Sequence, residues 1–124
     1  MKTIIAGSRG IYDIRAVMVA VKDSGFAITE VVSGAARGVD RLGETWAKRH
    51  GVPIKRFIPI WRDRDGVYNP RAGFQRNADM AKYAEAAVII WDGESTGTAD
   101  MIARAKRLRL KLYVHRTDIV EGLI

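Results

Sequence analysis

The chain contains no cysteine, and it has no long run of apolar residues. Without cysteine there are no disulfides and no thiolate metal sites, which fits a reducing compartment. No stretch approaches the ~20 apolar residues that a membrane-spanning helix needs. The apolar run near the start stops at residues 7–9, too early for the core of a secretion signal. We therefore expect a cytoplasmic protein with no membrane partner.

Acidic residues are scarce relative to basic ones, with 14 Asp and Glu against 21 Lys and Arg, so the formal net charge is +7. Arginine, the more frequent basic residue, favours two-pronged contacts to phosphate oxygens. We expect an anionic partner, first of all a nucleotide-like small molecule, with a nucleic acid as an alternative. The densest basic segment, residues 104–111, is interpreted as a solvated helix face, with a nucleic-acid or subunit contact left open.

Apolar residues are spread over all 124 positions, a length that suits one compact domain and is too short for two. Apolar runs predict strands, and helical spacing predicts helices between them. The strands are expected at 2–6, 28–32, 54–58, 86–91 and 110–115, and the helices from Asp13, after Gly38, over 74–84 and around Met101, before a tail at 118–124. Such alternation is typical of parallel sheets covered on both faces. The predicted fold class is α/β, a single Rossmann-like three-layer domain over residues 1–124 with a mostly parallel five-stranded sheet.

Glycine-rich segments follow several of these strands. Ligands of such folds bind at the carboxyl ends of the strands, where this chain has residues 7–10, 33–38, the loop around Trp61, and residues 92–98. A helix start leaves amide hydrogens unpaired and attracts an anion where glycine lets the backbone come close. We expect the starts of the second and fourth helices to converge on one phosphate site. Each loop taken alone also fits an ordinary tight turn with a helix cap.

Residues 59–73 are too polar for a core element and long for a connection, which is typical of a functional loop or lid. Trp61 and Tyr68 are candidates for stacking on a base. Asp63, Asp65 and Gly66 follow the opening of a calcium loop, but the later acidic ligands are absent. A polar turn is the preferred interpretation there. No metal site and no cofactor is expected.

Three sets of residues carry family resemblances. Residues 7–9 and 32–40 resemble the Rossmann-like domain of the DNA-processing DprA/Smf family. Residues 76–80, followed by an apolar strand and a Gly-Thr loop, resemble the Lonely Guy nucleoside-monophosphate phosphoribohydrolases, once labelled lysine decarboxylases. Both belong to the SLOG superfamily, and the resemblance to its small YspA or cpYpsA-related branch covers nearly the whole chain. The residues that point to this branch are Pro59, Trp61, Gly73, Arg76, Asn77, Trp91, Asp92, Gly93, Ser95, Gly97 and Thr98.

The resemblance implies roles for individual residues. Arg76 matches the arginine that, in Lonely Guy enzymes, contacts the phosphate or ribose of the ligand and assists N-glycosidic cleavage. Gly97 and Thr98 match the phosphate-binding pair of those enzymes. Their glutamate three residues after that threonine is replaced here by Met101. The candidate catalytic residues are Arg76 and Asp79, with Asp40 and Asp92 as further substitutes for the missing carboxylate.

The sequence is therefore consistent with three functions. The first is binding or sensing of a nucleotide or nucleotide-derived ligand through the glycine-rich phosphate loops. The alternatives are hydrolysis of a nucleotide N-glycosidic bond and DprA-like binding of single-stranded DNA. The resemblance also implies a homo-oligomer, a dimer or higher. The predicted ligand-binding residues are Gly7, Ser8, Arg9, Ser33, Gly34, Ala36, Arg37, Gly38, Asp40, Trp61, Arg76, Asn77, Asp92, Gly93, Ser95, Gly97 and Thr98.

Overall fold

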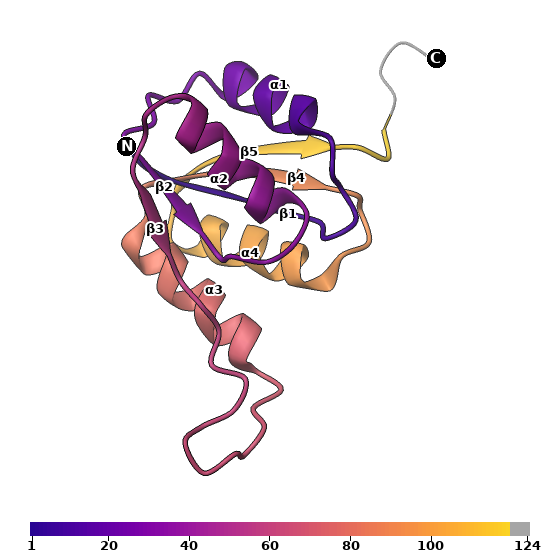
Figure 1. Cartoon of the computed structure of the whole chain (residues 1–124). Coiled ribbons are helices and arrows are strands. Elements are labelled where there is room, and N and C mark those ends of the chain that lie inside the picture. The colour runs from indigo at the N-terminus through magenta and orange to yellow at the C-terminus, as the bar shows by residue number, and fades with distance from the viewer. Residues whose placement is uncertain (120–124) are drawn as a thin grey trace.

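The computed structural model describes residues 1–119, in which strands and helices alternate along the chain (Figure 1). Their order is β1 (Lys2–Gly7), α1 (Ile14–Ser24), β2 (Glu30–Ser33), α2 (Val39–Arg49), β3 (Ile54–Arg56), α3 (Ala72–Tyr83), β4 (Ala86–Trp91), α4 (Thr96–Arg107) and β5 (Lys111–Arg116). The predicted tail lies mostly outside the described residues, and the extent of the domain over residues 1–124 stays a prediction.

The five strands form one sheet in the order β3-β2-β1-β4-β5, and every neighbouring pair is parallel. Helices α1 and α2 cover one face of the sheet, and α3 and α4 cover the other (Figure 1). The predicted α/β class, with a Rossmann-like three-layer arrangement and a five-stranded sheet, is confirmed. The sheet is wholly parallel rather than mostly so.

Side-chain alternation on the central strands builds two cores, one on each face. On β1, Ile4 packs with Met80 of α3, while Ile5 packs with Val17 of α1 on the opposite face. Residues 86–90 of β4 are fully buried, as expected for a strand covered by helices on both sides. The apolar runs at residues 2–6 and 86–91 are thus explained by two-sided burial.

Strand β3 is shorter than predicted. The apolar run at residues 54–58 suggests five residues, but the strand covers only Ile54–Arg56. The Phe57 amide still donates to the Ser33 carbonyl oxygen at 2.8 Å, after which the chain leaves the sheet and the side chain of Ile58 is 70% exposed. Pro59 follows, and its missing amide hydrogen does not support further pairing at this edge strand.

Strands β1 and β4 lie side by side at the centre of the sheet, although the connections after them run to opposite faces. A reversal of strand order of this kind opens a crevice at the carboxyl ends of the two strands. The fold therefore directs the loops after β1 and β4 to a common site. Among residues 1–119, no helix combines the length and the apolar character that crossing a bilayer requires.

Candidate ligand-binding site

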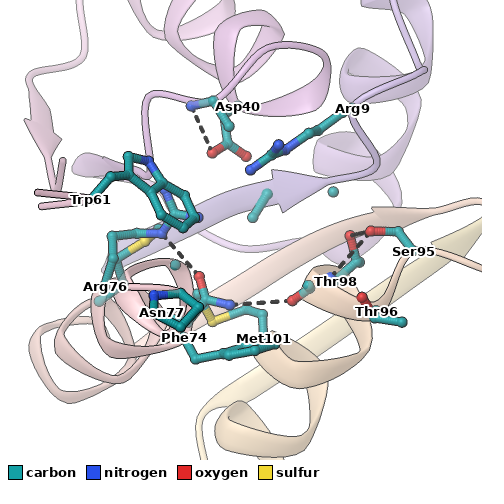
Figure 2. A pocket seen from close by; sticks show the side chains of 17 residues that line it. Arg9, Asp40, Trp61, Phe74, Arg76, Asn77, Ser95, Thr96, Thr98 and Met101 are labelled. Carbon is teal, nitrogen blue, oxygen red and sulfur yellow. Dashed lines mark hydrogen bonds between the residues drawn. The ribbon is translucent and has the colours of Figure 1, made fainter. Parts of the chain in front are cut away.

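A cavity of about 410 Å³ lies at the carboxyl ends of β1 and β4 (Figure 2). Its volume falls in the range of small-molecule sites. Segments from both halves of the chain form its walls. The lining residues are Ala6, Gly7, Arg9, Ala36, Asp40, Trp61, Pro70, Gly73, Phe74, Arg76, Asn77, Met80, Ser95, Thr96, Gly97, Thr98 and Met101.

Two residues at the end of β1 hold the two central strands together beneath the cavity. A Cβ on Gly7 would lie 1.9 Å from the carbonyl oxygen of Ile90, so only glycine allows β1 and β4 to approach this closely. The Ser8 amide donates to the same oxygen at 3.1 Å, and the Ser8 hydroxyl accepts the Asp92 amide hydrogen at 3.0 Å. The Ser8 side chain is therefore buried, and it does not line the cavity.

The start of α4 presents open amide hydrogens to the cavity. Ser95 caps the helix, and its hydroxyl accepts hydrogen bonds from the Thr98 amide at 3.4 Å and the Thr98 hydroxyl at 3.0 Å. The amides of Thr96 and Gly97 belong to the first turn, which has no intrahelical acceptor, and they form no hydrogen bond among the described residues. No atom lies within 4 Å of a Cβ built on Gly97. An anion therefore has open access to this helix start.

The turn before α4 is shaped by Asp92. Its carboxylate accepts the amide hydrogens of Ser95 and Glu94, each at 2.9 Å. These two bonds stabilise the ionised form and lower the pKa of Asp92, against a smaller effect of burial. Asp92 itself does not line the cavity. Its hydrogen bonds hold the loop, from which Ser95, Thr96 and Thr98 line the cavity.

Asp40 in the first turn of α2 and Ala36 in the loop before it line the same cavity, but two amides of this loop already have side-chain acceptors. The Asp40 carboxylate accepts the Ala36 amide hydrogen at 3.2 Å, and the Ser33 hydroxyl accepts that of Ala35 at 3.0 Å. Residues at the starts of both helices therefore line one cavity, and a phosphate site shared by the two helix starts stays a prediction.

Asp40 is the only acidic residue among those that line the cavity in the described chain. Burial raises the pKa of its carboxyl from 3.8 to about 6, although the Ala36 amide and the positive charge of Arg76 act in the opposite direction. In Figure 2 the guanidinium of Arg9 points into the cavity towards this carboxyl. The cavity thus combines two cations with one weakly acidic carboxyl group.

Arg76 and Asn77 connect three segments around the cavity. Nη1 of Arg76 donates to the Gly34 carbonyl oxygen at 2.6 Å, and its Nε donates to Oδ1 of Asn77 at 3.1 Å. The Asn77 amide group then donates to the Gly97 carbonyl oxygen at 3.2 Å and to Asp100 at 3.1 Å. A Cβ on Gly34 would lie 2.7 Å from both Arg76 Nη1 and Asp40 Oδ2. Glycine at position 34 therefore leaves the space in which these two side chains sit.

Trp61 lies on an arm, residues 57–71, that projects from the layers between β3 and α3 (Figure 1). Arg62 and Tyr68 form an antiparallel bridge within the arm. The Trp61 ring stacks on Tyr68 with centroids 6.3 Å apart and planes at 16°. Trp61 remains 38% exposed while lining the cavity beside Pro70 and Phe74. A flat apolar surface thus stands at the cavity mouth.

The structure brings together most of the predicted binding residues. Ten of them line the cavity: Gly7, Arg9, Ala36, Asp40, Trp61, Arg76, Asn77, Ser95, Gly97 and Thr98. Gly34 and Arg37 line a neighbouring groove, together with Arg9, Ala36, Trp61 and Arg76. The other five predicted binding residues, together with the predicted catalytic residue Asp79, line neither hollow; the five are Ser8, Ser33, Gly38, Asp92 and Gly93. Ligand contact by any of these residues stays a prediction.

Two of those six have surroundings that bear on their predicted roles. Ser33 is buried and donates its hydroxyl hydrogen to Glu44 at 2.7 Å. Asp79, the predicted catalytic partner of Arg76, is exposed on α3 and is not brought to the cavity with it. Residues 1–119 contain no cluster of three His, Cys, Asp or Glu side chains that could hold a metal ion.

Several lining residues were not predicted, although the sequence carries a signal for some. Gly73, Arg76, Asn77 and Met80 are spaced i, i+3, i+4, i+7 and share one face of α3. The same spacing relates Thr98 to Met101 on α4. Helical periodicity therefore places Gly73 and Met80 on the same face of α3 as Arg76. Met80 and Met101 are both buried and give the cavity an apolar floor.

Comparison with known families identifies the family of the chain. Residues 1–63, half of the chain, match the sequence model of the YspA, cpYpsA-related SLOG family. The chain belongs to that SLOG family. Membership indicates nucleotide-related binding or processing. No curated protein matches the chain.

The SLOG match covers one part of the cavity wall. It includes β1 to β3 and the first residues of the arm, and therefore Arg9, Asp40 and Trp61. Arg76 and the start of α4 lie beyond the matched residues. The cavity is thus completed by a segment that the family match does not reach.

Proposed function

We propose that the cavity of this SLOG protein binds a nucleotide or nucleotide-derived ligand through its phosphate. The observation that carries the proposal is the meeting of Arg9 with the open amides of Thr96 and Gly97 in one cavity. Arg9 forms no salt bridge in the described chain, although its guanidinium points towards the Asp40 carboxyl. A phosphate takes hydrogen bonds from both kinds of donor.

The rest of the cavity suits a nucleoside. The hydroxyls of Ser95 and Thr98 stand beside the open amides and offer further polar contacts. Met80 and Met101 supply an apolar floor, and the exposed ring of Trp61 supplies a plane on which a base stacks. A ligand with an anionic end and a flat apolar end matches this division.

Isothermal titration calorimetry with adenosine 5′-monophosphate and adenosine tests the proposal. The monophosphate should bind, and loss of its phosphate should weaken binding at least tenfold, because charge-assisted bonds are each worth roughly 1.5–3 kcal/mol. Arg9→Ala should weaken monophosphate binding by roughly tenfold. Arg107→Ala, which removes an exposed arginine at the far end of α4, is the matched control and should change it less than twofold.

Equal binding of adenosine and its monophosphate would contradict phosphate recognition. Absence of binding for AMP, GMP, CMP and UMP alike would remove the nucleotide proposal. Equal losses in the Arg9 and Arg107 variants would mean that net charge, and not the cavity, attracts the ligand.

A second candidate function, hydrolysis of the N-glycosidic bond, is favoured by the position of Asp40. In such a reaction the protonated carboxyl gives its proton to the departing base as the bond from C1′ to nitrogen breaks. Water then adds to C1′ and returns a proton to the Asp40 carboxylate, which yields free base and ribose phosphate. A carboxyl with a pKa of about 6 is suited to both steps near neutral pH.

Chromatography of nucleotides incubated with the protein tests hydrolysis. Free base and ribose 5-phosphate should appear together in equal amounts, faster at pH 5.5 than at pH 7.5 because Asp40 must start protonated. Asp40→Asn should lower the rate by roughly 100-fold or more. If no bound nucleotide yields base, hydrolysis is refuted and binding alone remains.

A further inference from the structure

A second hollow of about 590 Å³ adjoins the cavity. We call it the arginine groove. The two hollows share Arg9, Ala36, Trp61 and Arg76, so they are continuous. The groove is lined by Arg9, Gly34, Ala35, Ala36, Arg37, Arg41, Ile58, Pro59, Trp61 and Arg76.

The lining of the arginine groove is strongly basic, although Asp40 attracts Arg76 and Glu44 attracts Arg41 from outside it. Four of its lining residues are arginines, and none is acidic. None of these four forms an ion pair in the described chain, whereas Arg15, Arg56, Arg104 and Arg116 each pair with a carboxylate. Four arginines without a salt-bridge partner in the described chain thus line one hollow.

Arg37 and Arg41 distinguish the groove from the cavity. Both are exposed and line only the groove. Arg41 directs Nε to the Ala35 carbonyl oxygen at 3.3 Å, which leaves its terminal nitrogens available, and the Arg37 side chain forms no hydrogen bond among the described residues. Arginine guanidinium groups bind phosphate through two parallel hydrogen bonds.

We propose that the arginine groove holds a second phosphate group of the ligand, bound by Arg37 and Arg41, while the first phosphate lies in the cavity. The inference rests on the proposed function and narrows it to nucleotides that carry two phosphate groups. Arg9 and Arg76 border both hollows, so one short ligand reaches from one to the other. The two phosphates are either joined as a diphosphate or attached to different ribose oxygens.

Calorimetric titration with three adenine nucleotides tests the inference. The probes are AMP with one phosphate, ADP with two joined phosphates, and adenosine 3′,5′-bisphosphate with two separate phosphates. At least one of the two-phosphate probes should bind roughly tenfold more tightly than AMP. The tighter of the two identifies how the phosphates are arranged.

The double variant Arg37→Ala/Arg41→Ala should remove this advantage and leave AMP affinity within about twofold. The double variant Lys106→Ala/Arg107→Ala is the matched control, since it removes two positive charges from exposed residues of α4. These residues lie about 15 Å along the helix from its cavity end, at 1.5 Å per residue. The control should keep the preference for two phosphates.

Three outcomes would overturn the inference. If AMP binds and neither two-phosphate probe binds more tightly, the groove does not recognise phosphate, although the proposed function stands. Equal loss in both double variants would assign the preference to net charge. A single-stranded oligothymidylate that binds more tightly than every mononucleotide, with affinity rising with length, would assign the groove to a nucleic-acid strand. Failure of AMP itself to bind is separate and contradicts the proposed function.

Discussion

At the level of single residues, Asp40 occupies an unusual position. Its carboxyl is buried at the start of α2, where it accepts the Ala36 amide hydrogen and faces Arg9 and Arg76 across the cavity. Glu44, one turn further along α2, adds a negative charge that opposes ionisation of Asp40. Burial has the largest effect and raises the pKa to about 6. The folded protein therefore disfavours the ionised form that an exposed aspartate adopts at neutral pH.

Because of this raised pKa, the contribution of Asp40 to the free energy of unfolding decreases as pH rises. Because the folded pKa lies above the ordinary value of 3.8, the contribution of Asp40 is complete below pH 3.8 and is lost as pH rises through about 6. The loss amounts to about 3 kcal/mol. Asp40→Asn removes it, so urea denaturation should show the variant gaining stability relative to the unaltered protein between pH 4 and pH 7.

The comparison between the two proteins isolates Asp40. Glu44 and Asp92 have lowered pKa values, so their contributions are lost as pH falls, but both residues remain in the variant. A stability difference that stays constant from pH 4 to pH 7 would contradict the raised pKa of Asp40.

Single residues also show how much of the site could be predicted from the sequence. Arg76 and Asn77 were predicted from a short motif, and the structure places them in the cavity wall with Gly97 as a partner. The hydrogen bond from the Ala36 amide to Asp40 was not predictable, because the sequence does not show whether an aspartate at this position binds the preceding loop or a ligand. Asp79 illustrates the reverse, since its place on the exposed face of α3 depends on where the helix packs.

At the level of elements, the site depends on how closely β1 approaches β4. The Cα partners Gly7 and Ile90 face each other in the ladder. A Cβ on Gly7 would also lie 2.9 Å from the side chain of Val39 on α2. The glycine therefore permits both the strand pairing and the packing of α2 over it.

Gly7→Ala should destabilise the protein by roughly 2–4 kcal/mol, because the new methyl group meets a backbone carbonyl that cannot move alone. Gly97→Ala is the contrasting change. It adds a methyl group in open space within the first turn of α4 and should stabilise by up to about 1 kcal/mol. Guanidinium denaturation of both variants measures the midpoints, with the slope as a check on two-state behaviour. Equal stability of the two variants would contradict the close approach at Gly7.

Strand prediction succeeded where burial alone decides the structure. The run at residues 86–91 coincides with β4 because the strand is covered on both faces. The run at 54–58 overestimates β3 because the chain leaves the sheet after Phe57, whose ring packs against Tyr83 with centroids 5.6 Å apart. An apolar residue on an edge strand and one packed beside the sheet look alike in sequence.

At the level of the whole molecule, the alternation of elements was sufficient to predict a parallel sheet. It was not sufficient to predict that β4 returns to lie beside β1, which defines the strand order and brings the two loops together. The cavity follows from this non-local pairing, so its location at the strand ends was predictable while its walls were not. Self-association and a cytoplasmic location stay predictions.

The bridge from Gly34 through Arg76 and Asn77 to Gly97 has a thermodynamic consequence. It joins parts of the chain that are far apart in sequence, so no local segment builds the cavity by itself. Local unfolding of any one of these segments would therefore disrupt the cavity. A bound molecule therefore opposes opening of the entire domain, and its binding free energy is added to the global unfolding equilibrium.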